Sequence, residues 1–290
     1  MVLLHFVDLD PELALLRPLG GFFTLRTPLG SPGEPDRPLP TLEQAYARAP
    51  VQAPTKAPGR SGAGLHDDPL AFRVRKVTRA LRAPEERIGT SVAQQGLAAR
   101  LWSVALGCAA LYGCVPDLAP GLLRWDPDAS APDDLWLTRV RARRPRPGNA
   151  ASVAGAYPDA VACAVAESLA ETVADTVLED HLVPLAAALR ARCPVAPGLL
   201  RGNAASALAA TARLLGRWAD EHSRPDVAAR TRALTAALLA HPLLADTGTL
   251  SDGVFRRRSC CLYYRVPGGG LCGDCCFTRP PRSSPRHPSG

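Results

Sequence analysis

The chain has 290 residues, of which 47% are hydrophobic, and its formal net charge is +7. This length is sufficient for one large domain, or for a main domain with a small appendage. No apolar run reaches the length of a membrane span, and the start "MVLLHFVDLDPEL" lacks the basic segment of a signal peptide, so we expect a cytoplasmic protein.

The positive charge is concentrated near the C-terminus. Residues 253–290 contain seven arginines and one acidic residue, Asp274, which gives +6 and leaves about +1 for the rest of the chain. No basic stripe follows a predicted helix, and no nucleic-acid-binding module is recognisable. We therefore expect no nucleic acid partner.

Residues 1–82 are interpreted as an N-terminal segment with a linker. The stretch "GGFFTLR" (20–26) predicts a short strand. Residues 27–68 are rich in proline and glycine, which is typical of a loop or a partly disordered linker. A short helix is predicted within it, around "TLEQAYARA".

Residues 83–250 are predicted to form a helical domain. Apolar residues recur at three- and four-residue spacing over 83–117, behind an acidic first turn that favours a helix N-terminus. The alternating segments "GLLRWDP" and "LWLTRVRA" predict a β-hairpin with a long turn. Asn203 is a candidate N-cap and Pro184 a candidate kink. Further helices are predicted over 159–192, 203–219, 225–240 and 241–245.

The segment "RRRSCCLYYRVPGGGLCGDCC" (256–276) holds five of the nine cysteines. Four of them have the spacing C-C-x10-C-x2-C, and four thiolates suit either zinc or an iron–sulfur cluster. Zinc sites usually combine two C-x2-C knuckles, whereas an adjacent pair directs its sulfurs apart, which favours a two-iron cluster. Zinc and an unmetallated set of thiols remain as alternatives. The proposed ligands are Cys260, Cys261, Cys272 and Cys275.

The residues between and beside these cysteines suit the same interpretation. The glycines allow positive φ and close backbone approach, so that N–H groups can point at the sulfurs. The arginines would offset the negative charge of the cluster and raise its potential. The glycines are Gly268, Gly269, Gly270 and Gly273, and the arginines are Arg256, Arg257, Arg258 and Arg265.

The remaining cysteines and histidines give no second site. Cys276 has no assigned role. Cys108, Cys114, Cys163 and Cys193 lie in apolar helical contexts or at helix ends and are interpreted as buried small hydrophobic residues. The six histidines show no ligand spacing, and no phosphate-binding loop or hydrolase motif is present, so no catalytic residue is assigned.

The predicted fold is mainly α (α+β). It combines a large helical domain over 83–250 with a small β-hairpin and an N-terminal strand element. A C-terminal cysteine-rich iron–sulfur lobe over 251–278 follows, and 279–290 are expected to be a disordered tail.

Two stretches resemble the FhuF-like ferric-siderophore reductase family. "RRSCCLYYRVPGGGLCGDC" resembles its C-terminal signature, which carries a 2Fe-2S cluster on C-C-x10-C-x2-C. "HLVPLAAALRARCPVAPGLLRGNAASALAATARLL" (181–215) is similar to its substrate-domain segment, with a G-N-x-A-S-like core at Gly202, Asn203, Ala205 and Ser206. Arg201 stands where many relatives carry an aromatic residue.

The resemblance implies an enzyme that reduces a ferric siderophore of the hydroxamate type and releases ferrous iron. It implies one 2Fe-2S cluster on the four cysteines and a siderophore pocket between residues 159–245 and the cysteine lobe, with Arg201 and Asn203 as substrate contacts. The expected partners are the siderophore, a ferredoxin-like electron donor and, by peripheral association, the inner membrane face. A zinc-stabilised siderophore- or protein-binding module and an iron–sulfur redox sensor remain alternatives.

Overall fold

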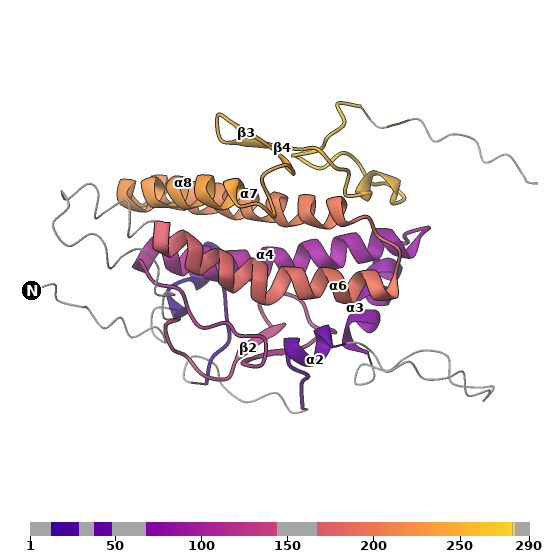
Figure 1. The fold of residues 1–290 in the computed structure, drawn as a ribbon, viewed down its shortest axis with the longest axis horizontal. Coiled ribbons are helices and arrows are strands. Elements are labelled where there is room, and N and C mark those ends of the chain that lie inside the picture. The colour runs from indigo at the N-terminus through magenta and orange to yellow at the C-terminus, as the bar shows by residue number, and fades with distance from the viewer. Residues whose placement is uncertain (1–12, 29–37, 48–67, 144–166, 280, 282–290) are drawn as a thin grey trace, which may run out of the picture.

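The computed structural model describes residues 13–28, 38–47, 68–143, 167–279 and 281 (Figure 1). Most of the predicted linker, Cys163, the start of the helix predicted from 159 and nearly all of the predicted tail lie outside these ranges.

Three long helices form the centre of the fold. α4 (Glu86–Tyr112) packs along α7 (Pro197–Glu221), and α8 (Pro225–Ala240) packs against both. The indole Nε1 of Trp102 donates a hydrogen bond to the Ala204 carbonyl oxygen at 3.0 Å, which joins α4 to α7. α4 is buried over most of its length and ends at Gly113, whose φ of 68° provides a left-handed C-cap.

Shorter helices cover the other side of α4. α3 (Pro69–Ala80), which the sequence analysis did not predict, packs on α4, and Asp68 caps its first turn through a hydrogen bond from the Ala71 N–H. The π-helix η3 (Asp175–Leu182) leads directly into α6 (Val183–Arg192). Pro184 therefore lies in the first turn of α6, where proline is tolerated. The predicted short helix near residue 41 is present as α2 (Leu42–Tyr46), with Thr41 in a capping box.

Two antiparallel hairpins complete the described fold. β1 (Leu123–Trp125) pairs with β2 (Leu135–Leu137), which confirms the predicted hairpin. β3 (Gly248–Ser251) pairs with β4 (Val254–Arg257) and carries the chain from α8 to the cysteines. This second hairpin was not predicted.

Three sequence predictions are wrong in detail. α7 begins at Pro197, because proline has its φ already fixed for a first helical turn, so Asn203 is an interior residue and not an N-cap. Residues 241–245 form turns and not a helix. Residues 20–26 form a turn followed by one isolated bridge from Arg26 to Trp136, so the predicted N-terminal strand is absent.

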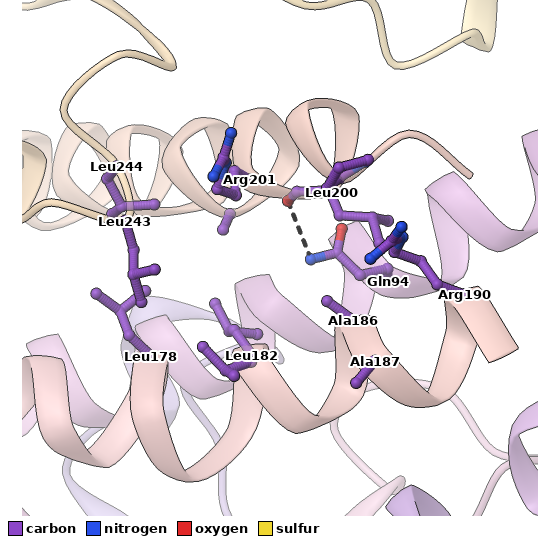
Figure 2. A pocket seen from close by; sticks show the side chains of 13 residues that line it. Gln94, Leu178, Leu182, Ala186, Ala187, Arg190, Leu200, Arg201, Leu243 and Leu244 are labelled. Atoms are coloured by element: carbon purple, nitrogen blue, oxygen red, sulfur yellow. Dashed lines mark hydrogen bonds between the residues drawn. The ribbon is translucent and has the colours of Figure 1, made fainter. Parts of the chain in front are cut away.

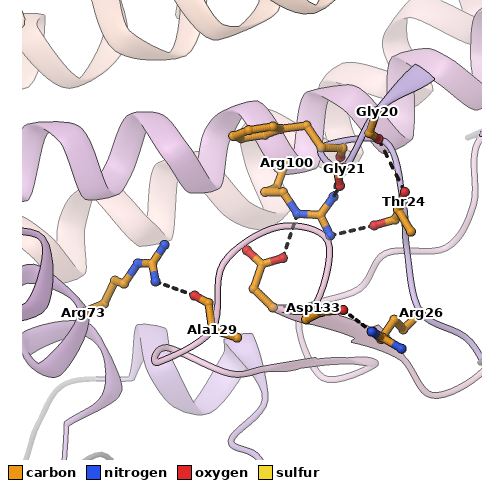
Figure 3. A network of polar contacts seen from close by, with 10 residues as sticks. Gly20, Gly21, Thr24, Arg26, Arg73, Arg100, Ala129 and Asp133 are labelled. Carbon is orange, nitrogen blue, oxygen red and sulfur yellow. Dashed lines mark hydrogen bonds and ion pairs between the residues drawn. The ribbon is translucent and has the colours of Figure 1, made fainter. Parts of the chain in front are cut away.

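A buried arginine ties the N-terminal segment and the β1–β2 loop to α4 (Figure 3). The Arg100 side chain is 1% exposed, and its Nε donates to Asp134 Oδ1 at 2.8 Å. Its other nitrogens donate to the carbonyl oxygens of Gly21, Phe22 and Thr24. Four hydrogen bonds thus join the guanidinium to a carboxylate and three main-chain carbonyl oxygens, which is how a cation is accommodated in a core.

The hydrophobic core extends from Leu13 in the N-terminal segment to Phe255 in β4. The boundaries predicted after residues 82, 250 and 278 remain predictions, because shared packing does not define which segment folds independently. Within the described ranges, no helix combines the length and apolar character needed to cross a membrane.

Candidate metal centre

The cysteine lobe, defined here as residues 258–277, follows β4 and lies over the N-terminal ends of α4 and α7. It contains one turn of 3-10 helix, η4 (Tyr263–Arg265). Ser91 Oγ in α4 donates to the Cys261 carbonyl oxygen at 2.8 Å, and Ser259 Oγ donates to the Gly198 carbonyl oxygen of α7 at 3.1 Å. The lobe is therefore held on two helices.

The Sγ atoms of Cys261 and Cys272 are 3.7 Å apart. A disulfide would require about 2.05 Å. Two thiolates on one tetrahedral ion with bonds of about 2.3 Å lie about 3.8 Å apart, so this spacing is that of two ligands sharing one metal. The Cys260 thiol also contacts Cys261, and the Cys275 N–H donates to the Cys272 carbonyl oxygen at 3.1 Å. All five cysteines of this segment are free.

Backbone N–H groups point at three of the sulfurs. The Leu262 N–H lies 3.2 Å from Cys260 Sγ, the Phe277 N–H lies 3.4 Å from Cys275 Sγ, and the Tyr263 N–H bonds Cys261. Each donor comes two residues after its cysteine. Such donors stabilise thiolates and cluster sulfurs.

The glycines act differently from the prediction. Gly268 has a φ of 74°, and a Cβ at Gly269 would lie 2.5 Å from the Tyr263 carbonyl oxygen, so these two need to be glycine. Gly270 and Gly273 show neither feature. Sequence reasoning expected glycine N–H groups at the sulfurs, but the hydrogen bonds found in the described lobe come from non-glycine residues.

The thiols influence one another's ionisation. Hydrogen bonds from the Cys260 and Cys272 thiols lower the pKa of Cys261 to about 2. The pKa values of Cys260 and Cys272 are raised, first by their hydrogen bonds to Cys261 and then by burial. Ionisation of Cys261 is thus favoured, and ionisation of Cys260 and Cys272 is opposed. A bound cation would remove that opposition, because metals are held by thiolates.

Arg257 provides a buried positive charge beside this thiolate. The residue is 2% exposed, its Nη2 donates to Asn203 Oδ1 at 2.6 Å, and its charge favours the Cys261 thiolate. Its Nε and Nη1 are buried without a hydrogen-bond partner, and it forms no ion pair with a carboxylate in the described ranges. Unpaired buried donors on a cation fit an anionic group such as a thiolate-ligated cluster.

The three other arginines differ from Arg257. Arg258 pairs with Asp246 at 3.1 Å and Arg265 pairs with Glu85 at 2.8 Å, all at the surface, while Arg256 is exposed on β4. The sequence could not separate these four residues. The structure distinguishes them, because alternate side chains of β4 point inward: Phe255 and Arg257 are buried, whereas Arg256 is exposed.

Asn203 connects the buried arginine to α4. Its Nδ2 donates to the Ser91 carbonyl oxygen at 2.9 Å and to Ser91 Oγ at 3.0 Å. Sequence reasoning did not identify Ser91, since nothing in the sequence signals a contact across 112 residues. Asn203 is fully buried with both ends of its amide bonded, and Arg201 is exposed on α7.

A cavity of about 270 Å³ lies beneath α7 (Figure 2). Most of its lining comes from residues 159–245, but no residue of the cysteine lobe lines it, so the pocket predicted against the lobe remains a prediction. The cavity is lined by residues of α4, η3, α6, α7 and the turn after α8. Arg201 lines this cavity, whereas Asn203 does not.

Sulfur ligands with backbone donors and a buried counter-charge define this lobe as a candidate centre of the iron–sulfur class. The four proposed cysteines fit such a cluster in donor type, although no set of three or more potential ligand side chains in the described ranges is already gathered around one point. Residues 257–277 match the family model of the FhuF 2Fe-2S C-terminal domain, which confirms the resemblance over these residues and implies an iron–sulfur cluster. No curated protein matches the chain.

Proposed function

We propose that this protein reduces a ferric siderophore, of the hydroxamate type, and releases ferrous iron. The observation that carries the proposal is the set of thiols beside Arg257, whose buried Nε and Nη1 have no hydrogen-bond partner, within a segment that matches the FhuF 2Fe-2S domain. Cys260, Cys261, Cys272 and Cys275 would hold the cluster.

The chemistry follows from the ligand preference of iron. Hard oxygen donors such as hydroxamates hold ferric iron much more tightly than ferrous iron. One electron from an external donor, for which we propose a ferredoxin-like protein, therefore releases the metal and leaves the chelator intact. A bound 2Fe-2S cluster supplies the one-electron redox centre that this exchange needs.

The chain's own residues would have three tasks. The cysteines hold the iron, and Arg257 offsets the accumulated negative charge. Ser91 and Asn203 fix the position of Arg257 and of Cys261 relative to α4 and α7. Arg256 and Arg258, on the outer face, would attract an anionic ferric complex or an acidic donor protein, with a rate that falls as salt is added.

Anaerobic reconstitution with iron and sulfide tests the cofactor. We expect a brown protein with charge-transfer absorption that a Cys261→Ser variant loses, while a Cys108→Ser variant, altered at a buried cysteine of α4, keeps it. A colourless protein with one bound zinc would instead establish the binding-module alternative.

Single-turnover mixing tests the activity. Reduced protein mixed without oxygen with ferric hydroxamate siderophores should lose its reduced-cluster signal as ferrous iron appears. A cluster that cycles with a donor but transfers no electron to any ferric siderophore would contradict the proposal and favour a redox sensor.

A further inference from the structure

The cavity beneath α7 has one polar end and one apolar end (Figure 2). Gln94 and Arg190 lie toward one end, Leu178, Leu243 and Leu244 lie toward the other, and Arg201 lies between them. At about 270 Å³ it is at the small end of the range for sites that enclose a drug-sized molecule. It therefore suits one arm of a large molecule or a small amphiphile.

Gln94 brings an unsatisfied acceptor to the polar end. The residue is 2% exposed, and its Nε2 donates to the Leu200 carbonyl oxygen at 3.3 Å. Its Oε1 is buried without a hydrogen-bond partner. A buried carbonyl oxygen without a donor is costly, so an O–H or N–H group from a ligand would relieve that cost.

Two cations stand at the rim of the cavity, Arg190 at the end that holds Gln94 and Arg201 nearer the middle. Arg190 in α6 and Arg201 in α7 are both exposed, and no hydrogen bond or ion pair joins either to a described residue through its side chain. Arg190 shares an end of the cavity with Gln94, and its guanidinium group can bind a carboxylate with paired N–H donors.

The apolar end is lined from an irregular helix. Leu178 and Leu182 belong to the π-helix η3, and π-helical turns occur frequently at functional sites. Val183, the next residue, lines the cavity and is 44% exposed, although it is a large apolar side chain.

We propose that the cavity binds an amphiphilic anion whose carboxylate meets Arg190, at the end that holds Gln94. A hydroxyl or N–H near the carboxylate donates to Gln94 Oε1, and an aliphatic arm extends toward Leu178 and Leu243. A medium-chain 3-hydroxy acid has this order of groups. It can come from a free fatty acid. The 3-hydroxyacyl arm of an acylated siderophore presents the same hydroxyl and chain, with a neutral carbonyl oxygen in place of the carboxylate as the acceptor for Arg190, and this second source rests on the proposed function.

The position of the cavity connects it to the cysteine lobe. Leu200 lines the cavity and also packs in a small cluster with Leu199, Val195 and Cys193, against which Leu262 of the lobe packs. A siderophore arm held there would therefore keep its iron-bearing part near the start of α7.

Calorimetric titration of the full chain with 3-hydroxyoctanoate, octanoate and octanol tests the ligand class. We expect affinity to fall in that order, by about fivefold for loss of one hydrogen bond and about tenfold for loss of the charge. Gln94→Leu should remove the preference for 3-hydroxyoctanoate over octanoate. Arg190→Gln should weaken both acids about tenfold and leave octanol unchanged.

Matched variants keep the result interpretable. Arg213→Gln with Arg217→Gln alters two exposed arginines of α7 outside the cavity and should change nothing. Ala186→Phe and, at a more exposed position, Ala187→Phe should each abolish binding by filling the cavity. Unchanged affinity in both filled variants, or no binding of any probe to the unmodified protein, would overturn the proposal.

A competition experiment distinguishes the two sources. A ferric siderophore with a 3-hydroxyacyl arm should displace 3-hydroxyoctanoate, whereas its deacylated form should not. Displacement assigns the arm to the siderophore, and its absence assigns the site to the free acid; both outcomes support the ligand class. Because these titrations need neither cluster nor electron donor, their failure leaves the proposed reductase activity untouched.

Discussion

Arg257 is the single residue whose substitution tests the electrostatics of the site most directly. Arg257→Gln removes a buried positive charge beside the sulfurs, so reduction, which adds negative charge, becomes less favourable. We expect the midpoint potential of the reconstituted protein to fall by about 60 mV, equivalent to about 1.4 kcal/mol for one electron. A redox titration followed by electron paramagnetic resonance measures it.

The neighbouring arginines are the controls for that change. Arg256→Gln and Arg258→Gln remove exposed charges, and Arg258 is already paired with Asp246, so solvent screening should keep their effects much smaller. A shift for Arg258→Gln as large as that for Arg257→Gln would show that burial does not set the contribution.

His181 gives the fold a dependence on acid. It is fully buried, its Nε2 donates to the Leu118 carbonyl oxygen at 2.6 Å, and its Nδ1 lies 3.0 Å from the Tyr46 hydroxyl. Burial lowers its pKa from 6.5 to about 4. Between pH 4 and pH 6.5 the unfolded chain therefore binds a proton at His181 that the native state does not bind. The contribution of His181 to stability is complete above pH 6.5 and is lost as pH falls toward 4.

His181→Gln keeps one donor and one acceptor but cannot titrate. In urea unfolding, the unmodified protein should lose about 2 kcal/mol more than this variant between pH 7 and pH 5, because one pKa unit corresponds to about 1.4 kcal/mol. Parallel pH profiles for the two proteins would contradict this role.

For single residues, the sequence predicts which side chains could bind a metal better than it predicts how the residues around them are arranged. The four proposed cysteine ligands follow from spacing alone, because the spacing of thiols restricts the metals that they can hold. Ser91 and the roles of Asn203 and Arg257 could not be predicted, since they depend on which face of α7 and of β4 meets the lobe.

Among the elements, the contact between α7 and the cysteine lobe depends on Gly202. A Cβ at this position would lie 2.1 Å from Ser259 Oγ and 3.3 Å from Arg257 Nη2. Alanine can be accommodated if Ser259 rotates, but Gly202→Leu should displace the lobe and reduce iron incorporation several-fold, with unchanged helix content by circular dichroism.

Gly216→Leu is the matched control for that variant, because it lies in the same helix with nothing within 4 Å of the added Cβ. It should load iron normally. Equal iron content in the two leucine variants would show that close packing at Gly202 is not required for assembly.

The joint between α4, the N-terminal turn and the β1–β2 loop depends on Arg100. Arg100→Met leaves Asp134 buried without its cation, and we expect a loss of about 3–5 kcal/mol in the free energy of unfolding. Adding Asp134→Leu should recover much of this loss.

The exposed pair of Lys76 and Asp128 gives the comparison, since Lys76→Met should cost less than about 1 kcal/mol. Chemical denaturation of the three variants measures the difference. A cost for Arg100→Met no greater than for Lys76→Met would contradict the role assigned to the buried pair.

Elements with a periodic apolar pattern were predicted correctly, whereas element boundaries and short strands that depend on a few residues were not. The helices that became α4 and α8 and the β1–β2 hairpin follow from apolar spacing. The start of α7 was missed because "PVAPG" reads as a break, although a proline in the first turn of a helix is favourable. The β3–β4 hairpin was not predicted because Val254, an apolar residue, faces outward, so that apolar and polar residues do not alternate strictly along β4.

For the molecule as a whole, metal removal should separate the lobe from the helices. The described hydrophobic core contains none of the five lobe cysteines, so chelation should leave helix content nearly unchanged while tryptic cleavage at Arg258 and Arg265 increases. Circular dichroism and timed proteolysis measure the two effects. Cooperative loss of helix on chelation would instead show that the metal stabilises the entire fold.

The bond between Ser91 and Cys261 has a consequence for how the protein matures. It joins residues 170 positions apart, so a ribosome has already released α4 and α7 before the cysteines emerge. We therefore expect a cofactor to be inserted after α4 and α7 have formed the platform on which the lobe rests. In a cell short of iron, we therefore expect protein whose helices are folded and whose cysteine lobe holds no iron, and which can take up iron later.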